Sequence, residues 1–466
     1  MSPITLQQFE ASALADMIEF GRIDAISPSY DPDWEHRGRI DAAADFMAQW
    51  ASQRSLASFE VSIRRIAGRT PVVTVTVDST SPARGTVLLY GHLDKQPPLG
   101  DWSEGLSPFD PVRRGDRVYA RGLADDGYAM FSSLLALEDL ESRGVPHARC
   151  VVLIEASEES GSPDLEAHLD DLADELGDVE LLLCLDSGAL TYDRLWVTTS
   201  LRGNLVARVR VDVLNYGQHS GSASGVVPSS FRIMRQLLDR LEDSGTGRVR
   251  VPELHVEIPV SHRRAAEAVT AEFGDVAGDE QPVVEGLTLM GESPAERLLQ
   301  RTWAPTLSVT GVGGIPEMTS AGNVLRPFTE LVLSLRVPPG VTEEVATSAV
   351  RRALLDNPPH GARVRVEFDS YAEGWVMPEL APWLATAIDS ASRDACGEPP
   401  GFCGEGGSIP FLAVLAERFP KVQFVATGVL GPGSNAHGID EMLDLPLTVA
   451  VTNAIGTVIA AHATHQ

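Results

Sequence analysis

The first 200 residues alternate between apolar runs and segments with helical periodicity. Four runs rich in β-branched and aliphatic residues predict strands, at 71–78, 85–94, 150–159 and 179–188. Between them, residues 129–144 have the 3.6-residue periodicity of a helix and end at a glycine. The last two runs are almost continuously apolar, which is typical of strands that are buried on both faces of an α/β sheet.

The pattern changes near residue 201. Alternating strands are predicted at 205–214, 329–337 and 363–371, and amphipathic helices at 229–243 and 342–356. One polar face on each strand indicates a small α+β domain whose sheet is covered by helices on one side.

The first pattern returns after about residue 372, as a helix, an apolar strand and a final helix. The simplest explanation is that one domain is inserted into another. We therefore predict an α/β domain with a mostly parallel central sheet, formed by residues 1–200 and 372–466. Residues 201–371 are predicted to form the inserted α+β domain.

Composition and charge narrow the class of protein. The 466 residues include 65 acidic and 37 basic ones, so the net charge is −28. Such a chain repels nucleic acid and anionic membranes, and its 43% hydrophobic content is typical of a globular protein. The four cysteines match no zinc-finger or disulfide spacing. We find no signal-peptide pattern and no 18-residue apolar stretch, and we expect a soluble, cytoplasmic protein.

Acidic and histidine motifs follow the apolar strands, where open α/β sheets bind their ligands. In GHLDKQPP, His92 and Asp94 project from the same face of a strand, as a metal ligand and the carboxylate that orients it. The alternative is a hydrogen-bonded surface histidine. In ARGLADDG, Asp125 and Asp126 fit either a helix N-terminus or a metal bridge, and the two roles are compatible.

Two further motifs end the next apolar strands. In IEASEESGS, Glu158 and Glu159 form either a solvated turn or a metal ligand beside a general base that acts on water. In LLLCLDSG, Asp186 is either an N-cap or a metal ligand.

Two glycine-rich segments lie near the other end of the chain. The glycines of GEGGSIPF (404–411) allow close backbone approach to a ligand carboxylate, or form a plain turn. His437 follows a Gly/Ser/Asn loop, and alone it carries little weight. Together, however, the motifs offer an oxygen and nitrogen ligand set suited to two zinc, manganese or cobalt ions, and they indicate an enzyme. The ligand candidates are His92, Asp125, Glu159, Asp186 and His437.

These motifs resemble those of the co-catalytic metallopeptidases of the M20 type, which include dipeptidases, carnosinases, carboxypeptidase G2 and aminoacylase-1. The similarity extends nearly from end to end, through ISPSYDP, GHLD, VYARGLADD, EESGS, LCLDSG, EGGSIP and NAHGIDE. The motifs EESGS, GQHSGSASG and EGGSIP favour the dipeptidase branch.

The resemblance implies a role for each matching residue. One metal would be bound by His92 and Asp186 and the other by Glu159 and His437, with Asp125 as the bridge. Asp94 would orient His92, and Glu158 would be the general base. The second domain would be a lid and a dimerisation domain. It would supply His219 to stabilise the oxyanion and Arg336 to bind the substrate carboxylate, and Asn323 lies in the same pocket. Further substrate contacts are expected from Glu405, which would bind the free amine, and from Gly407 and Ser408.

The sequence departs from the family pattern at two places that we expect to alter the pocket. Tyr128 follows Gly127 in a segment where the family usually has a lysine, and Arg326 replaces a proline of the lid. We expect a homodimeric hydrolase of dipeptides or small peptides with a free C-terminal carboxylate. An N-acyl-amino-acid deacylase using the same site is the alternative, and a non-catalytic scaffold is a more distant one.

Overall fold

The structure is a computed structural model that describes residues 3–81 and 85–465. Its residues form two compact units. The first unit comprises the described residues of Met1–Thr199, Met377–Phe402 and Val414–Gln466. The second unit comprises Ser200–Val376 and Cys403–Ala413. The segment Cys403–Ala413, which carries Glu405, Gly407 and Ser408, therefore belongs to the second unit.

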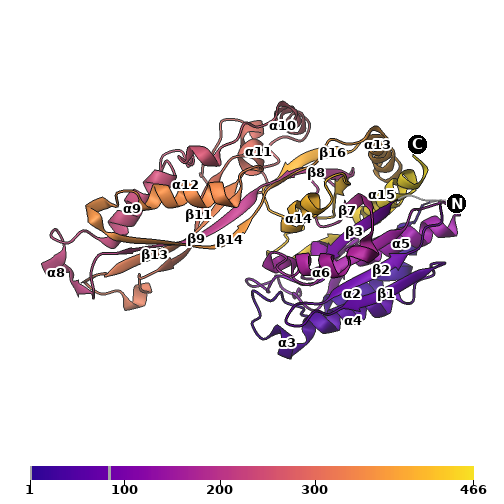
Figure 1. Cartoon of the computed structure of the whole chain (residues 1–466), viewed down its shortest axis with the longest axis horizontal. Coiled ribbons are helices and arrows are strands. Elements are labelled where there is room, and N and C mark those ends of the chain that lie inside the picture. Colours follow the sequence, from indigo (N-terminus) through magenta and orange to yellow (C-terminus); the bar gives the residue numbers. More distant parts are fainter. Residues whose placement is uncertain (1–2, 82–84, 466) are drawn as a thin grey trace. The chain divides into compact units, whose positions relative to one another are not determined.

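A six-stranded mixed sheet is the centre of the first unit (Figure 1). Its order is β1 (Phe59–Arg64), β2 (Val72–Val77), β6 (Cys150–Glu155), β3 (Thr86–His92), β7 (Val179–Cys184) and β17 (Gln423–Ala426). The last four strands run parallel to one another, whereas β1 and β2 pair antiparallel. All residues of β6 and all residues of β7 except Glu180 are buried, as their almost continuously apolar sequences predict, and β3 is also wholly buried.

Helices pack against this sheet and against one another. Helix α4 (Arg39–Ala51) contacts β1 and β2, and α5 (Ala129–Ser142) contacts β3 and β6. Helix α15 (Leu445–Thr464) packs on α5 and on α13 (Pro382–Cys396). The shorter helices are α1 (Leu6–Phe9), α2 (Ala15–Gly21), α3 (Trp34–Arg37), α6 (Leu165–Asp171) and α7 (Ala173–Leu176). A small antiparallel sheet is formed by β18 (Met442–Asp444), β5 (Arg117–Tyr119) and β4 (Val112–Arg114).

Helix α15 corrects one expectation. No apolar stretch of 18 residues was predicted, but this helix has 20 residues and contains an 18-residue window whose mean hydropathy of 1.4 is enough to cross a membrane by length and composition. Of that window, 67% is buried inside the protein, as in the core helix of a globular domain. Its threonines return hydrogen bonds to backbone carbonyls one turn earlier, as Thr448 does to Asp444, so the polar residues did not interrupt the helix.

The second unit contains an antiparallel four-stranded sheet in the order β11 (Thr306–Gly313), β13 (Phe328–Val337), β9 (Gly203–Asp212) and β14 (Arg363–Ala372). Helices α9 (Ser230–Leu241) and α12 (Glu343–Leu355) cover one face of it (Figure 1). Alternate residues of β9 and β13, among them Val209 and Leu333, form a core with these helices. This arrangement agrees with the predicted α+β organisation.

Several shorter elements complete the fold. Strands β10 (Gln218–His219) and β12 (Val324–Leu325) form a two-stranded ladder, and β15 (Trp375–Val376), β8 (Trp196–Leu201) and β16 (Gly401–Glu405) form a three-stranded sheet. The remaining helices are α8 (Ser220–Ala223), α10 (Val260–Phe273), α11 (Pro294–Thr302) and α14 (Pro410–Arg418).

Candidate metal centre and substrate-binding residues

The acidic and histidine motifs of the first unit meet at the carboxyl edge of its parallel strands. His92 is the last residue of β3, and in the β3–β6 register it pairs with Glu155, three residues before Glu158. Asp186 lies two residues after the end of β7. Because β6, β3 and β7 are parallel neighbours, their polar ends converge at one edge of the sheet.

Asp125 lies between two imidazoles. One of its carboxylate oxygens, Oδ1, is 3.2 Å from Nε2 of His92, and the other, Oδ2, is 3.0 Å from Nε2 of His437. The peptide bond between Asp125 and Asp126 is cis. A carboxylate with one oxygen toward each histidine has the geometry of a bridging ligand.

The remaining acids complete two groups of donor atoms. Oε2 of Glu159 is 3.2 Å from Nε2 of His437, and Oδ2 of Asp186 is 3.9 Å from Nε2 of His92. The first group is His92 with Asp125 and Glu159, and the second is His92 with Glu158 and Asp186. Within each group, the ligand atoms lie within 4.8 Å of one another.

His92 is not a surface histidine, because its side chain is wholly inaccessible to solvent. Its Nδ1 lies 3.0 Å from the backbone oxygen of Asp94 and 3.6 Å from the Asp94 carboxylate. That carboxylate accepts hydrogen bonds from the backbone amides of Glu158 and Glu159, each at 3.1 Å. Asp94 therefore holds the EESGS turn as well as facing His92.

The electrostatics of the cluster favour cations. Burial, together with the charge of Asp186, raises the pKa of Glu158 well above its usual range. Burial and the neighbouring Asp125 raise the pKa of Glu159. For His437, burial disfavours the charged ring, but hydrogen bonds to Asp125 and Glu159 outweigh it and raise the pKa to about 11. Gathered carboxylates of this kind need positive charge between them.

The donor set fits divalent metal ions. Carboxylate and imidazole ligands suit zinc, manganese and cobalt. Asp126 adds support, because its side chain is buried beside Asp125 and its carboxylate is not fully hydrogen-bonded by the described residues. Its Oδ2 accepts from the His92 amide at 3.3 Å, whereas Oδ1 has no hydrogen-bond partner in the described part of the chain.

Close packing behind the cluster depends on Gly91 and Tyr128. A Cβ atom at Gly91 would lie 2.6 Å from the Asp126 carboxylate and 2.4 Å from the Cβ of Ala129, so only glycine fits. Tyr128 is fully buried and donates a 2.5 Å hydrogen bond to the backbone oxygen of Leu185, next to Asp186. The tyrosine that departs from the family pattern thus supports a loop of the cluster.

Sequence reasoning missed Gln96. Its amide donates a 2.7 Å hydrogen bond to Oε2 of Glu159, the same oxygen that faces His437. Gln96 lies in the GHLDKQPP motif, four residues after His92, so its proximity to the cluster was the available signal.

In the second unit, Arg336 meets the EGGS segment. Arg336 is half-buried on β13, and its Nη1 donates a 3.2 Å hydrogen bond to Oγ of Ser408. Gly407 precedes that serine, and a Cβ atom at Gly407 would meet nothing within 4 Å beyond its chain neighbours, so this backbone is approachable. Glu405 ends β16 in the same segment. A guanidinium, a hydroxyl and exposed backbone are the groups that recognise a carboxylate.

Arg202, a second arginine that contacts this segment, was not predicted from the sequence. Arg202 is buried, and its Nε donates to the carbonyl of Gly406 at 3.2 Å while Nη1 donates to Ala304 at 3.0 Å. Burial and the charges of Arg336 and Arg301 lower the pKa of Arg202 to about 10. It fixes the backbone beside Ser408 and adds positive charge near Arg336.

His219 and Asn323 lie on paired segments of the second unit. His219 pairs with Val324 in the β10–β12 ladder, and Ser220 donates to the backbone oxygen of Asn323 at 2.9 Å. The His219 ring is exposed, and its Nδ1 accepts from the Gly221 amide. The structure therefore brings these two predicted substrate contacts together, although 104 residues separate them.

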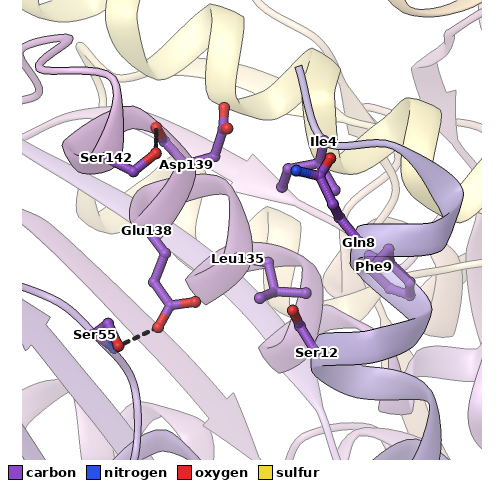
Figure 2. A pocket seen from close by; sticks show the side chains of 9 residues that line it. All are labelled: Ile4, Gln8, Phe9, Ser12, Ser55, Leu135, Glu138, Asp139 and Ser142. Atoms are coloured by element: carbon purple, nitrogen blue, oxygen red, sulfur yellow. Dashed lines mark hydrogen bonds between the residues drawn. The ribbon is translucent and has the colours of Figure 1, made fainter. Parts of the chain in front are cut away.

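A separate hollow of about 260 Å³ lies in the first unit (Figure 2). It is lined by helix α5 and by residues of the N-terminal segment, including Gln8 and Ser12. Glu138 accepts a hydrogen bond from the Ser55 amide, and Ser142 donates to the backbone oxygen of Asp139. None of the predicted site residues lines this hollow.

The fold and the cluster define an α/β protein with a candidate metal-binding centre at the edge of its central sheet. Comparison with known families agrees: residues 88–461 match the model of peptidase family M20/M25/M40. The chain belongs to this family of metallopeptidases, and the predicted fold class is confirmed.

Named relatives are dipeptidases. The chain is 28% identical to the cysteinylglycine-S-conjugate dipeptidase of Corynebacterium striatum over 369 residues, 77% of each chain. It is 24% identical over 390 residues to the human Beta-Ala-His dipeptidase, which is 79% of this chain and 73% of that one. Its fold resembles that of the dipeptidase Dug1p from Saccharomyces cerevisiae, with a TM-score of 0.77, 22% identity, and coverage of 99% and 97% of the two chains.

Proposed function

We propose that this protein is a metallodipeptidase that hydrolyses dipeptides or similar small peptides bearing a free C-terminal carboxylate. The observation that carries the proposal is the convergence of two histidines and four carboxylates at one edge of the sheet, at positions spread from His92 to His437. Relatives named for cleaving dipeptides support this substrate class over N-acyl amino acids.

Two divalent ions, zinc in the first place, are the proposed cofactors, and manganese or cobalt would suit the same donors. His92 and Asp186 would hold one ion, Glu159 and His437 the other, and Asp125 would serve both. When bound, the ions polarise the scissile carbonyl and lower the pKa of water.

Glu158 is the proposed general base. It takes a proton from the attacking water, whose oxygen bonds to the carbonyl carbon of the substrate. The C–N bond then breaks, and Glu158 passes the proton to the leaving amine, so one water is consumed and two amino acids are released. The position of Glu158 supports this role, because its carboxylate lies within 4.8 Å of the donor atoms of His92 and Asp186, beside the place where water would be activated.

The second unit is proposed to recognise the substrate. Arg336 and Ser408, with the backbone at Gly407, would bind the C-terminal carboxylate, and Glu405 the free amine. His219 would donate a hydrogen bond to the oxyanion, with Asn323 beside it. The hydrogen bond between Arg336 and Ser408 supports the first of these roles.

We also propose that the enzyme is a cytoplasmic homodimer that associates through the second unit. The outer strand β11 leaves one edge unpaired among the described strands of its sheet, and exposed apolar side chains lie on and after it. They are Val309, Val312, Ile315 and Met318. Such an edge is commonly covered by a partner. The four cysteines form no disulfide in the described chain, which suits a reducing compartment.

A substrate panel tests the proposed reaction. Chelator-treated protein is assayed with cysteinylglycine, β-alanyl-histidine and other dipeptides beside N-acetyl and N-succinyl amino acids, before and after zinc or manganese is added. We expect metal to restore cleavage of dipeptides and not of acylated compounds. Restored cleavage of the acylated compounds alone would contradict the proposal.

A further inference from the structure

A buried ion pair joins two motifs that lie 320 residues apart. Nη1 of Arg121 is 2.6 Å from Oε2 of Glu441, and the side chains are 1% and 0% exposed. Arg121 belongs to ARGLADDG and Glu441 to NAHGIDEM. Neither residue is among the proposed metal ligands.

Each member of the pair also holds the other's loop. The second guanidinium nitrogen of Arg121 donates a 2.5 Å hydrogen bond to the backbone oxygen of Gly438, the residue after His437. The other oxygen of the Glu441 carboxylate accepts from the Gly122 amide at 2.9 Å, three residues before Asp125. A backbone hydrogen bond from Ala120 to Glu441 closes the same junction at 3.1 Å.

His437 needs such support. Its side chain is 53% exposed, and its backbone has a φ of +62°, in the left-handed region that residues other than glycine rarely adopt. The short turn around it is closed locally by Asn435, which donates to the carbonyl of Ile439 and accepts from the Gly438 amide through its own backbone oxygen. The contact from Arg121 to Gly438 attaches this turn to the body of the unit.

The energetics of buried charges indicate that the Arg121–Glu441 pair positions two loops rather than adding stability to the fold. A buried ion pair loses solvation that its mutual attraction barely recovers, so apolar residues of similar volume often stabilise a fold at least as well. A pair with hydrogen bonds to two loops does something apolar residues cannot, because it fixes the distance and direction between those loops.

We propose that Arg121 and Glu441 are positioning residues that set Asp125 and His437 at the separation required to bind a metal ion together. The inference rests on the proposed function, since it requires that these two residues are ligands. It adds that metal affinity depends on a buried pair outside the ligand set.

Metal affinity of conservative variants tests the inference. Arg121→Lys keeps the buried positive charge but cannot donate in a fork to Glu441 and Gly438, and Glu441→Gln keeps the shape but removes the charge. The matched control is Glu175→Gln, which breaks the partly buried Arg64–Glu175 pair at the β1–β2 side of the sheet, whose nitrogen–oxygen distance is 2.7 Å. Zinc dissociation constants are measured by competition with a chromophoric chelator, and melting temperatures on metal-free protein.

We expect zinc dissociation constants to rise about 10- to 100-fold in both site variants, the usual effect of losing a residue that orients metal ligands. Turnover of a dipeptide should return toward the wild-type value at saturating zinc, and the control should bind zinc within about twofold of wild type. Should Glu441→Gln not fold, Arg121→Lys carries the test.

A lowered melting temperature with unchanged zinc affinity in Arg121→Lys would overturn the inference and leave the pair a purely structural one. Failure of the proposed function is distinguishable, because the wild-type protein would then bind no zinc at the cluster or would bind it without cleaving dipeptides.

Discussion

The two units present their proposed functional residues in opposite ways. In the first unit, ligand candidates such as His92, which ends the parallel strand β3, and Asp125, which lies in the segment before helix α5, are buried and contact one another directly. In the second unit, His219 is exposed on a two-stranded ladder and Arg336 is half-buried on a sheet. The first arrangement suits ions that must be held tightly, and the second suits a substrate that must enter and leave. Variants of the two units should therefore fail in different ways.

The largest expected effect is the loss of turnover in a variant of Glu158, which separates the chemical step from metal binding within the first unit. Glu158→Gln is expected to lower kcat by about 10²–10⁴-fold, because it removes the proposed proton acceptor. Metal content, measured by inductively coupled plasma spectrometry, should stay at the wild-type value. The control is Glu166→Gln, an acid on helix α6. Turnover near wild type in Glu158→Gln would refute its role as general base.

His219 tests whether the second unit takes part in the reaction. His219→Ala should lower kcat by about 10²–10³-fold, as the loss of one oxyanion donor does elsewhere. Bound metal should not change. Ser222→Ala, which removes only the hydrogen bond from Ser222 to the His219 carbonyl, is the matched control in helix α8. Loss of metal from His219→Ala would assign this histidine to the metal centre instead.

Arg336 should affect substrate binding more than turnover. Arg336→Met removes a charge-assisted contact to the substrate carboxylate, so KM should rise by about 100-fold, with a smaller change in kcat. Arg208→Met is the control, since Arg208 is an exposed residue of neighbouring β9 paired with Asp369. Steady-state kinetics on one dipeptide and on its C-terminal amide make the comparison. If Arg336→Met weakens both substrates equally, the carboxylate contact is wrong.

Glu405 gives the smallest and most selective effect. Glu405→Gln should weaken kcat/KM for dipeptides by about tenfold, since one charged contact to the free amine is lost. Blocking the amine of the substrate should produce the same loss in the wild-type protein and little further loss in the variant. Additive losses from the two changes would show that Glu405 does not contact the amine.

The cluster of the first unit could be predicted from the sequence because a strand ends where its run of apolar residues stops. Predicted strands at 85–94, 150–159 and 179–188 correspond to β3, β6 and β7, and the acidic residues follow where the apolar runs stop. Parallel pairing then brings those ends together. Strand β1 was not predicted, and neither was the antiparallel direction of β2, because alternation of polar and apolar residues does not encode the direction of a strand in its sheet.

Most of the site residues that were not predicted from the sequence act through contacts to backbone groups. Arg202 donates to carbonyls, and Arg121 reaches both a carbonyl and a carboxylate 320 residues away. Carbonyl groups occur at every residue, so no sequence pattern identifies which one an arginine contacts. Gln96 was not predicted for another reason. A single glutamine near a motif can have many roles, so its presence does not indicate which residue it contacts.

Titration of metal into chelator-treated protein tests the central claim most directly. Turnover of a single dipeptide is recorded at each addition, with bound zinc measured on the same samples. The account predicts no turnover without metal and a rise that saturates at two zinc ions per chain, with Asp125→Asn binding less zinc at every addition. Full turnover in the metal-free protein, or two bound ions without cleavage of any dipeptide, would contradict it.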